Sequence, residues 1–126
     1  MKMDREKIEE LLQMYFNASY EHKGELMLEV FHDPAHIYGL TADGALTDTK
    51  RDDFATRVSS HKTESPEVKF PRYNEIISID FTGDNTAVAK VKLRVMNTLF
   101  TDILSFMRVD GKWGIISKVL AGVPVE

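Results

Sequence analysis

Apolar side chains recur at helical intervals in the first part of the chain. Between residues 4 and 23 they fall three and four positions apart, which predicts an amphipathic helix with one buried face. Asp4 is expected to cap this helix, and His22-Lys23-Gly24 to end it, because cations suit the last carbonyls and glycine follows helix ends. The predicted buried face comprises Ile8, Leu11, Leu12, Tyr15 and Ser19.

Two shorter helices are predicted downstream. The first is expected to end at Asp33-Pro34, because proline disfavours helical backbone before it. Residues 35–41 then predict a strand that turns at residues 42–44 into a brief partner strand. The next helix follows residues 49–52, which resemble a capping box. The buried positions are Leu26, Met27, Val30 and Phe31 in the first of these helices and Phe54, Val58 and His61 in the second.

The second half of the chain follows a pattern with a period of two. Residues 63–72 hold two prolines and several charged side chains, which predicts a loop between the last helix and the first of these strands. The alternation that follows predicts strands with one face toward the core. Turns at residues 83–85, 97–98 and 110–111 divide the segment into four antiparallel strands, the last over residues 112–121, and Asp-Gly at the last turn is a strong hairpin signal.

The order of elements indicates the fold class. Helices placed before a strand meander are typical of an α+β fold in which the helices cover one sheet face. A length of 126 residues suits one domain. We therefore expect a single domain over residues 1–126, with no second domain to hold a cofactor and no cofactor.

Composition and charge narrow the classes of function. The chain carries 16 Lys and Arg against 20 Asp and Glu, a net charge of −4, and 43 % of its residues are hydrophobic. This balance lacks the broad basic surface of nucleic-acid binders, so we expect no nucleic-acid partner. With no cysteine, a disulfide framework, a zinc–thiolate site and a cysteine nucleophile are excluded. No apolar run reaches the roughly 18 residues of a membrane span, and the first residues are charged, so we expect a cytoplasmic protein with no membrane partner.

One acidic residue breaks the alternating pattern. Asp102 is in phase with Phe100 and Leu104, so it is expected to face the core, where an unpaired carboxylate is costly. Tyr15 faces the same interior if the first helix packs across the sheet, and its hydroxyl needs a partner. Asp102 is either a structural hydrogen-bond acceptor or a polar group at the base of a ligand cavity. If it is desolvated, we expect it to stay protonated and to donate.

Two stretches carry a resemblance to a known family. They are VFHDPAHIYG at residues 30–39 and TDILS at residues 101–105, which leads to VDGKW at residues 109–113. In these stretches the chain resembles the nuclear transport factor two-like superfamily, which has a cystatin-like α+β fold. Within that superfamily it is most similar to the "putative lumazine-binding" family. The resemblance covers almost the whole chain. The resemblance implies a curved antiparallel sheet wrapped by three N-terminal helices into a cone that can hold a ligand. It leaves the activity open, because the superfamily includes isomerases, polyketide cyclases, dehydratases and transport adaptors.

The ketosteroid isomerase branch of this superfamily suggests roles for three positions. Tyr15 matches the oxyanion tyrosine and Asp102 the proton-donating aspartic acid. The general-base position falls on Gly39, which has no side chain to take a proton. His36 lies on the same predicted strand and is an alternative base, although a histidine at a strand start beside proline is typical of the surface. His32 and His36, four apart across a proline, do not predict a metal site.

The resemblance also implies an assembly, because such proteins often form homodimers through the outer face of the sheet. We expect a homodimer here, since the strand phase assigned outward is more apolar than a monomer would leave exposed. One β-bulge in the last two strands would exchange the phases. The residues assigned outward are Ile103, Met107, Ile116 and Leu120.

Two main hypotheses follow for the function. In the first, the chain binds a small organic ligand, with Tyr15 and Asp102 fixing a carbonyl or ring nitrogen. In the second, it is an isomerase, cyclase or dehydratase that holds an enolate-like intermediate on the same pair, with His36 as a base. A third is an adaptor domain whose interior is only core. The expected pocket residues are Tyr15, Phe31, Tyr38, Phe54, Phe100, Asp102, Leu104 and Trp113.

Overall fold

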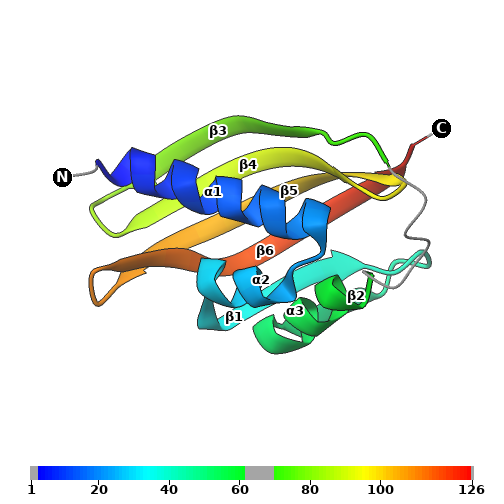
Figure 1. The fold of residues 1–126 in the computed structure, drawn as a ribbon. Helices are drawn as coiled ribbons and strands as arrows, with labels where there is room; N and C mark the ends of the chain where they lie inside the picture. Colours follow the sequence, from blue (N-terminus) through cyan, green and yellow to red (C-terminus); the bar gives the residue numbers. More distant parts are fainter. Residues whose placement is uncertain (1–2, 62–69, 126) are drawn as a thin grey trace.

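A long helix lies across a curved, open six-stranded sheet, and two shorter helices cover the same side of the sheet farther along (Figure 1). The computed structural model describes residues 3–61 and 70–125. The elements are α1 (Asp4–Glu21), α2 (Gly24–Val30), β1 (Phe31–Leu40), β2 (Leu46–Lys50), α3 (Arg51–Ser60), β3 (Asn74–Thr82), β4 (Thr86–Val95), β5 (Thr98–Val109) and β6 (Lys112–Pro124). The α+β class with three helices is confirmed, while the cone shape and the single domain stay predictions.

The sheet has the strand order β2-β1-β6-β5-β4-β3. Strands β3 to β6 form the predicted antiparallel meander, and β1 and β2 form the predicted short hairpin. The hairpin joins the meander through β1 and β6, which run parallel. The expectation of a wholly antiparallel sheet is therefore wrong at this pair, because a long connection that contains α3 and the meander lets β1 and β6 run in one direction.

The helix ends differ from the predictions by a few residues. Met3, not Asp4, precedes α1, and its backbone N–H donates to Glu6 Oε1 at 3.4 Å. The predicted stop is confirmed, because His22 has a φ of 57° in the left-handed region. Asp33-Pro34 does not end α2 but lies inside β1, where the pairing with β6 shifts register.

Two further predictions concern the segment around α3. Lys50 rather than Thr49 precedes the helix, so the capping-box prediction is one residue early. A loop was predicted for residues 63–72. Residues 63–69 of it lie outside the residues that the structure describes. Among the residues that the structure describes, no helix is both long and apolar enough to cross a membrane.

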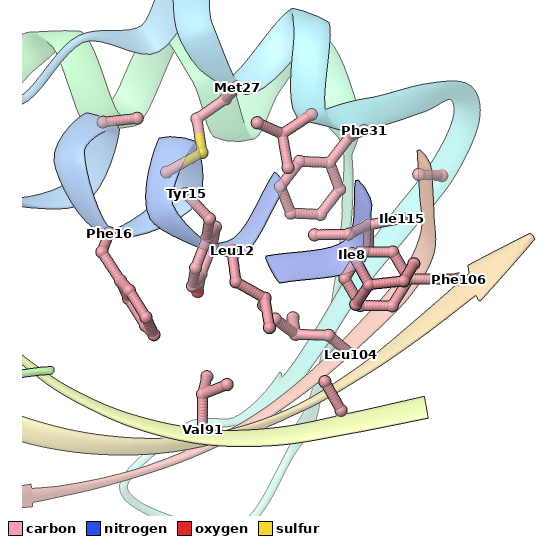
Figure 2. Close-up of a cluster of buried hydrophobic side chains, with 14 of the residues drawn as sticks. Ile8, Leu12, Tyr15, Phe16, Met27, Phe31, Val91, Leu104, Phe106 and Ile115 are labelled. Atoms are coloured by element: carbon pink, nitrogen blue, oxygen red, sulfur yellow. The ribbon is translucent and has the colours of Figure 1, made fainter. Parts of the chain in front are cut away.

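The core lies between α1 and the concave face of the sheet. Figure 2 shows side chains of α1, among them Leu12, Tyr15 and Phe16, pointing from the helix toward Val91 and Leu104 of the sheet. Each of these side chains is almost wholly removed from solvent. This burial holds the helix against the sheet through the hydrophobic effect.

A β-bulge in β6 decides which residues face the core beyond it. Ser105 pairs with Ser117 while Phe106 pairs with Ile115, so Ile116 is an extra residue without a partner on β5. The bulge turns Lys118 and Leu120 to the inner face. The assignment of Leu120 to the outer face is therefore wrong, and Val119 is the exposed residue instead.

Candidate functional site

A cavity of about 350 Å³ opens between the inner face of the sheet and the helices α1 and α3. Its wall is mostly apolar, and its ionisable groups come from several elements. The apolar part of the wall includes Ile37, Phe54, Leu93, Val95, Phe100 and Leu120. The ionisable residues that line the cavity are Tyr15, His22, Arg57, His61, Asp102 and Lys118.

Tyr15, Asp102 and Lys118 form a buried polar cluster at this cavity. The Tyr15 hydroxyl donates a hydrogen bond of 2.5 Å to Asp102 Oδ2. The Lys118 ammonium lies 3.8 Å from the same oxygen, within ion-pair range but beyond a hydrogen bond. Asp102 Oδ1 has no hydrogen-bond partner within residues 3–61 and 70–125. In this geometry Asp102 Oδ2 accepts a hydrogen bond from Tyr15, and donation from Asp102 to a ligand stays a prediction.

The environment of Lys118 is unusual for a lysine. Its side chain is buried, and Nζ lies 4.5 Å from the centre of the Phe54 ring and 5.0 Å from that of Tyr15. Burial lowers the pKa of the ammonium, Asp102 partly opposes this, and the positive charge of Arg57 adds to the lowering. Contacts with the two ring faces partly compensate for the lost hydration.

The Tyr15 hydroxyl is held in its protonated form. Its pKa is raised well above 10.0, first because the group is fully buried and then because of the negative charge and hydrogen bond of Asp102. A tyrosinate next to a carboxylate would carry a second buried negative charge. Tyr15 therefore keeps its proton over the physiological pH range and directs it at Asp102.

Each member of the cluster reaches the cavity for a local reason. Tyr15 lies on the buried face of α1, and Asp102 lies on the inner phase of β5 beside Leu104. Lys118 faces inward only because the bulge at Ile116 precedes it. Gly39 of β1 keeps space open, because a Cβ there would lie 3.1 Å from Leu120 Cδ1.

The structure brings half of the predicted pocket residues to the cavity. Tyr15, Phe54, Phe100 and Asp102 line it, and the other four do not. Phe31 and Leu104 are part of the buried core next to it. Tyr38 lies on the opposite face of β1, because it is in the other phase from the cavity residues Ile37 and Gly39. Trp113 lies at the far end of the sheet, where its indole Nε1 donates to Asp4 at 3.3 Å.

His36, the alternative base, does not line the cavity. It shares the outer phase of β1 with Tyr38, and the two rings stack at 6.0 Å between centroids. Its Nδ1 lies 2.5 Å from Asp48 Oδ1 on β2. His36 therefore cannot reach a molecule bound at Asp102. No group of three His, Asp or Glu side chains suited to a metal ion occurs within the described residues.

Four ionisable residues that line the cavity were not predicted from the sequence as site residues. His22 and His61, whose ring centroids are 5.7 Å apart, follow the ends of α1 and α3. Arg57 is on the last turns of α3, and Lys118 is on β6. Arg57 lies three positions after Phe54, a helical spacing that would have placed both side chains on the same face of the predicted helix. The sequence pattern gives no sign that the Lys118 side chain points toward the cavity.

The fold and the cavity together define a class, the cystatin-like α+β proteins. Within this class, the chain belongs to the family described as "Putative lumazine-binding", whose sequence profile matches residues 3–121. None of the curated proteins matches the chain significantly.

Solved structures agree with this assignment. An NTF2-like protein of unknown function from Shewanella baltica is 25 % identical and superimposes with a TM-score of 0.84, over 96 % of this chain and 94 % of that one. A second one, from Silicibacter pomeroyi, is 21 % identical with a TM-score of 0.82, over 98 % and 100 %. A ketosteroid isomerase-like protein from Erwinia carotovora atroseptica is 13 % identical with a TM-score of 0.73, over 98 % of each chain, and shares the fold.

Proposed function

We propose that this chain binds a small, largely apolar organic molecule in the cavity between the sheet and helices α1 and α3. The observation that carries the proposal is the buried cluster of Tyr15, Asp102 and Lys118 at an otherwise apolar wall. Small-molecule sites commonly combine apolar walls with a few converging polar groups. A merely structural core would have little use for an ammonium group with a carboxylate at 3.8 Å, because both must be desolvated.

The size of the cavity and the family description support the same proposal. A volume of about 350 Å³ lies at the lower end of the usual range for ligand pockets, so the ligand is expected to be compact. The family description makes lumazine the first molecule to test. The adaptor hypothesis would instead require an interior that is filled by side chains.

Binding can be tested on the full chain by ligand-observed NMR, with lumazine and a library of small cyclic molecules. Gly39→Leu places a side chain in the cavity beside Leu120 and should abolish binding, with Val95→Trp as a second blocking variant. Ala121→Leu places a leucine side chain on the exposed outer phase of β6 instead and should leave binding unchanged. Absence of binding for the whole set, or binding that both blocking variants retain, would refute the proposal.

The enzyme hypothesis remains a second candidate because two imidazoles line the cavity. His22 and His61 are placed where a base could act on a bound molecule, unlike His36. The enzyme would be an isomerase, cyclase or dehydratase, and Tyr15 and Asp102 would lie beside the negative charge that develops on an enolate-like intermediate. If molecules that bind are never converted, and if Asp102→Asn changes affinity alone, the chain is a binding protein.

A further inference from the structure

We propose that the ligand of this cavity is an anion, a compact cyclic or aromatic carboxylate whose charge lies between Lys118 and Arg57. This inference rests on the proposed binding function and deepens it by naming the ligand class. It follows from the charges around the cavity, from the donors of the two cations that no described carboxylate accepts within hydrogen-bond distance, and from the apolar wall.

Among the described residues, the charges that line the cavity do not balance. Lys118 and Arg57 supply two positive charges, while Asp102 is the one carboxylate among the described residues of the wall. The two imidazoles, His22 and His61, can only add to the positive side. A ligand with one negative charge would restore the balance, whereas a cationic ligand would increase the excess.

Lys118 has hydrogen-bond donors to offer. An ammonium carries three donors, and the distance of 3.8 Å to Asp102 Oδ2 is too long for a hydrogen bond. Its other close neighbours are the faces of the Tyr15 and Phe54 rings, which accept no conventional hydrogen bond. Within the described part of the chain, no carbonyl or hydroxyl oxygen accepts a hydrogen bond from Lys118. A carboxylate oxygen of a ligand would fill this role.

Arg57 is placed to share the same charge. It projects from α3, is exposed at the cavity, and lies 5.9 Å from the centre of the Phe54 ring. Its Nη2 donates only a long hydrogen bond of 3.4 Å to Thr49 Oγ1, and no carboxylate pairs with it among residues 3–61 and 70–125. The charge of Arg57 also acts on Lys118 by lowering its pKa, so the two cations repel each other. An anion between them would turn this repulsion into two attractions.

The rest of the wall defines the body of the ligand. Phe54, Phe100 and Leu120 surround the polar cluster with ring and methyl surfaces. A neutral amide with the same body would bury this apolar surface equally well and could accept one hydrogen bond from the ammonium, but it would bring no charge to offset the two cations. A carboxylate brings a negative charge as well as two acceptor oxygens, so the anion should be preferred over its neutral isostere.

The matched pair of 2-naphthoate and 2-naphthamide tests the inference by calorimetry or ligand-observed NMR on the full chain. The two molecules share one ring system and differ in charge. We expect the wild-type chain to bind the carboxylate at least tenfold more tightly than the amide. Lys118→Met keeps the length of the side chain without its charge and should remove this preference while leaving amide binding in place. Arg57→Gln, at an exposed position that does not endanger folding, should weaken carboxylate binding severalfold.

Lys112→Met serves as the control, because Lys112 is exposed next to the turn between β5 and β6 and is not among the residues that line the cavity. It should leave the affinities for both molecules unchanged. Equal affinity of the wild-type chain for acid and amide, or a preference that survives both Lys118→Met and Arg57→Gln, would overturn the inference while the proposed function stands. Binding of neutral library members but not of 2-naphthoate would do the same. If no molecule of any charge binds, the proposed function itself fails.

Discussion

Asp102 keeps a carboxylate in the core because two other side chains accommodate it. Its exposed fraction is 1 %, so the group has lost almost all of its hydration. The Tyr15 hydroxyl donates one hydrogen bond to the Asp102 carboxylate, and the Lys118 ammonium supplies an opposite charge next to it. Removing one partner of such a cluster leaves the rest buried and unsatisfied, which costs more than the net value of the interaction.

Tyr15→Phe should therefore lower the free energy of unfolding by about 1–3 kcal/mol, measured by urea denaturation. The ring is retained, so the loss reports on the hydroxyl and the acceptor that it leaves behind. Tyr73→Phe is the matched control, because the Tyr73 hydroxyl also bonds a carboxylate oxygen, Glu75 Oε1, at 2.5 Å but at an exposed site. The control should leave stability unchanged. Equal effects of the two variants would contradict the importance of burial.

The stability of the chain should depend on pH through Lys118. Its pKa is lowered by burial from 10.5, so between the lowered value and 10.5 the unfolded chain binds more protons than the folded one. The free energy of unfolding then rises with pH in this window. Tyr15 acts oppositely above pH 10.0, because its raised pKa retains a proton that the unfolded chain has lost. Urea denaturation in steps toward pH 10 should detect the rise.

The double variant Lys118→Met/Asp102→Asn removes both charges of the pair and is the control for this pH dependence. Its free energy of unfolding should change less with pH than that of the wild type over the same range. Identical pH profiles for the two proteins would mean that Lys118 is not destabilised by burial.

Single residues were predictable where a regular period reaches them. The inward position of Asp102 followed from its phase with Phe100 and Leu104, and that of Tyr15 from the helical repeat. The hydrogen bond between them joins residues 87 positions apart in the sequence. The sequence predicted that the Tyr15 hydroxyl needs a partner and offered Asp102 as a candidate. Lys118 was missed because a bulge breaks the period just before it.

At the scale of elements, close contact between two short helices helps to shape the site. The backbone N–H of Gly24, at the start of α2, donates to Ser59 Oγ of α3 at 2.9 Å. A Cβ at Gly24 would lie 2.1 Å from the Ala55 carbonyl oxygen, a main-chain atom that cannot rotate away. The absence of a side chain at Gly24 therefore lets α2 and α3 pack, and α3 carries Phe54 and Arg57 to the cavity.

Gly24→Ala should lower the free energy of unfolding by about 1–3 kcal/mol, because the helices must separate to admit the methyl group. Ser59→Ala removes only the hydrogen bond and should cost less. Glu25→Ala, at the next and exposed position of α2, is the control for helix propensity and should be neutral or slightly stabilising. A Gly24→Ala protein as stable as the control would contradict the close packing. Urea denaturation provides the measurement for all three variants.

The elements themselves were largely predictable, and their connections less so. Alternation of apolar and polar residues gave β4 and β5, and Asp110-Gly111 gave the turn before β6, where both residues have positive φ. Pairing of β1 with β6 was not predictable, because it joins strands that are far apart in sequence. Bulges at Ile77 and Ile116 were not predictable in position either, because each is a local register shift.

At the scale of the whole molecule, the outer face of the sheet is suited to a second copy of the chain. Ile103, Val119 and Tyr38 lie side by side across β5, β6 and β1, and the exposed fractions of the first two are 45 % and 47 %. The row continues to Lys90 on one side and to Asp48 on the other. In a two-fold symmetric pair crossing this row, each Lys90 can approach the partner's negative end. We therefore retain the homodimer as a proposal.

Light scattering at micromolar concentration should give a molar mass of twice the 14.4 kDa of one chain. Val119→Lys places a charge in the middle of the apolar row and should shift the mass toward that of one chain. Gln13→Lys adds the same charge to an exposed position of α1 and should leave the mass unchanged. A wild-type mass of one chain would refute the dimer.

The bulge at Ile116 lets this chain lose one residue without changing which side chains face the cavity. Deleting Ile116 would leave an unbroken ladder in which Lys118 still pairs with Leu104 and stays on the inner face. A ladder that kept Ile116 but lost the bulge would instead place Lys118 opposite Ile103 on the outer face and Val119 opposite Asp102 at the cavity. The charge that Lys118 brings to the cavity therefore depends on the bulge, and a relative with one residue fewer at this point should keep the same side chains at the cavity.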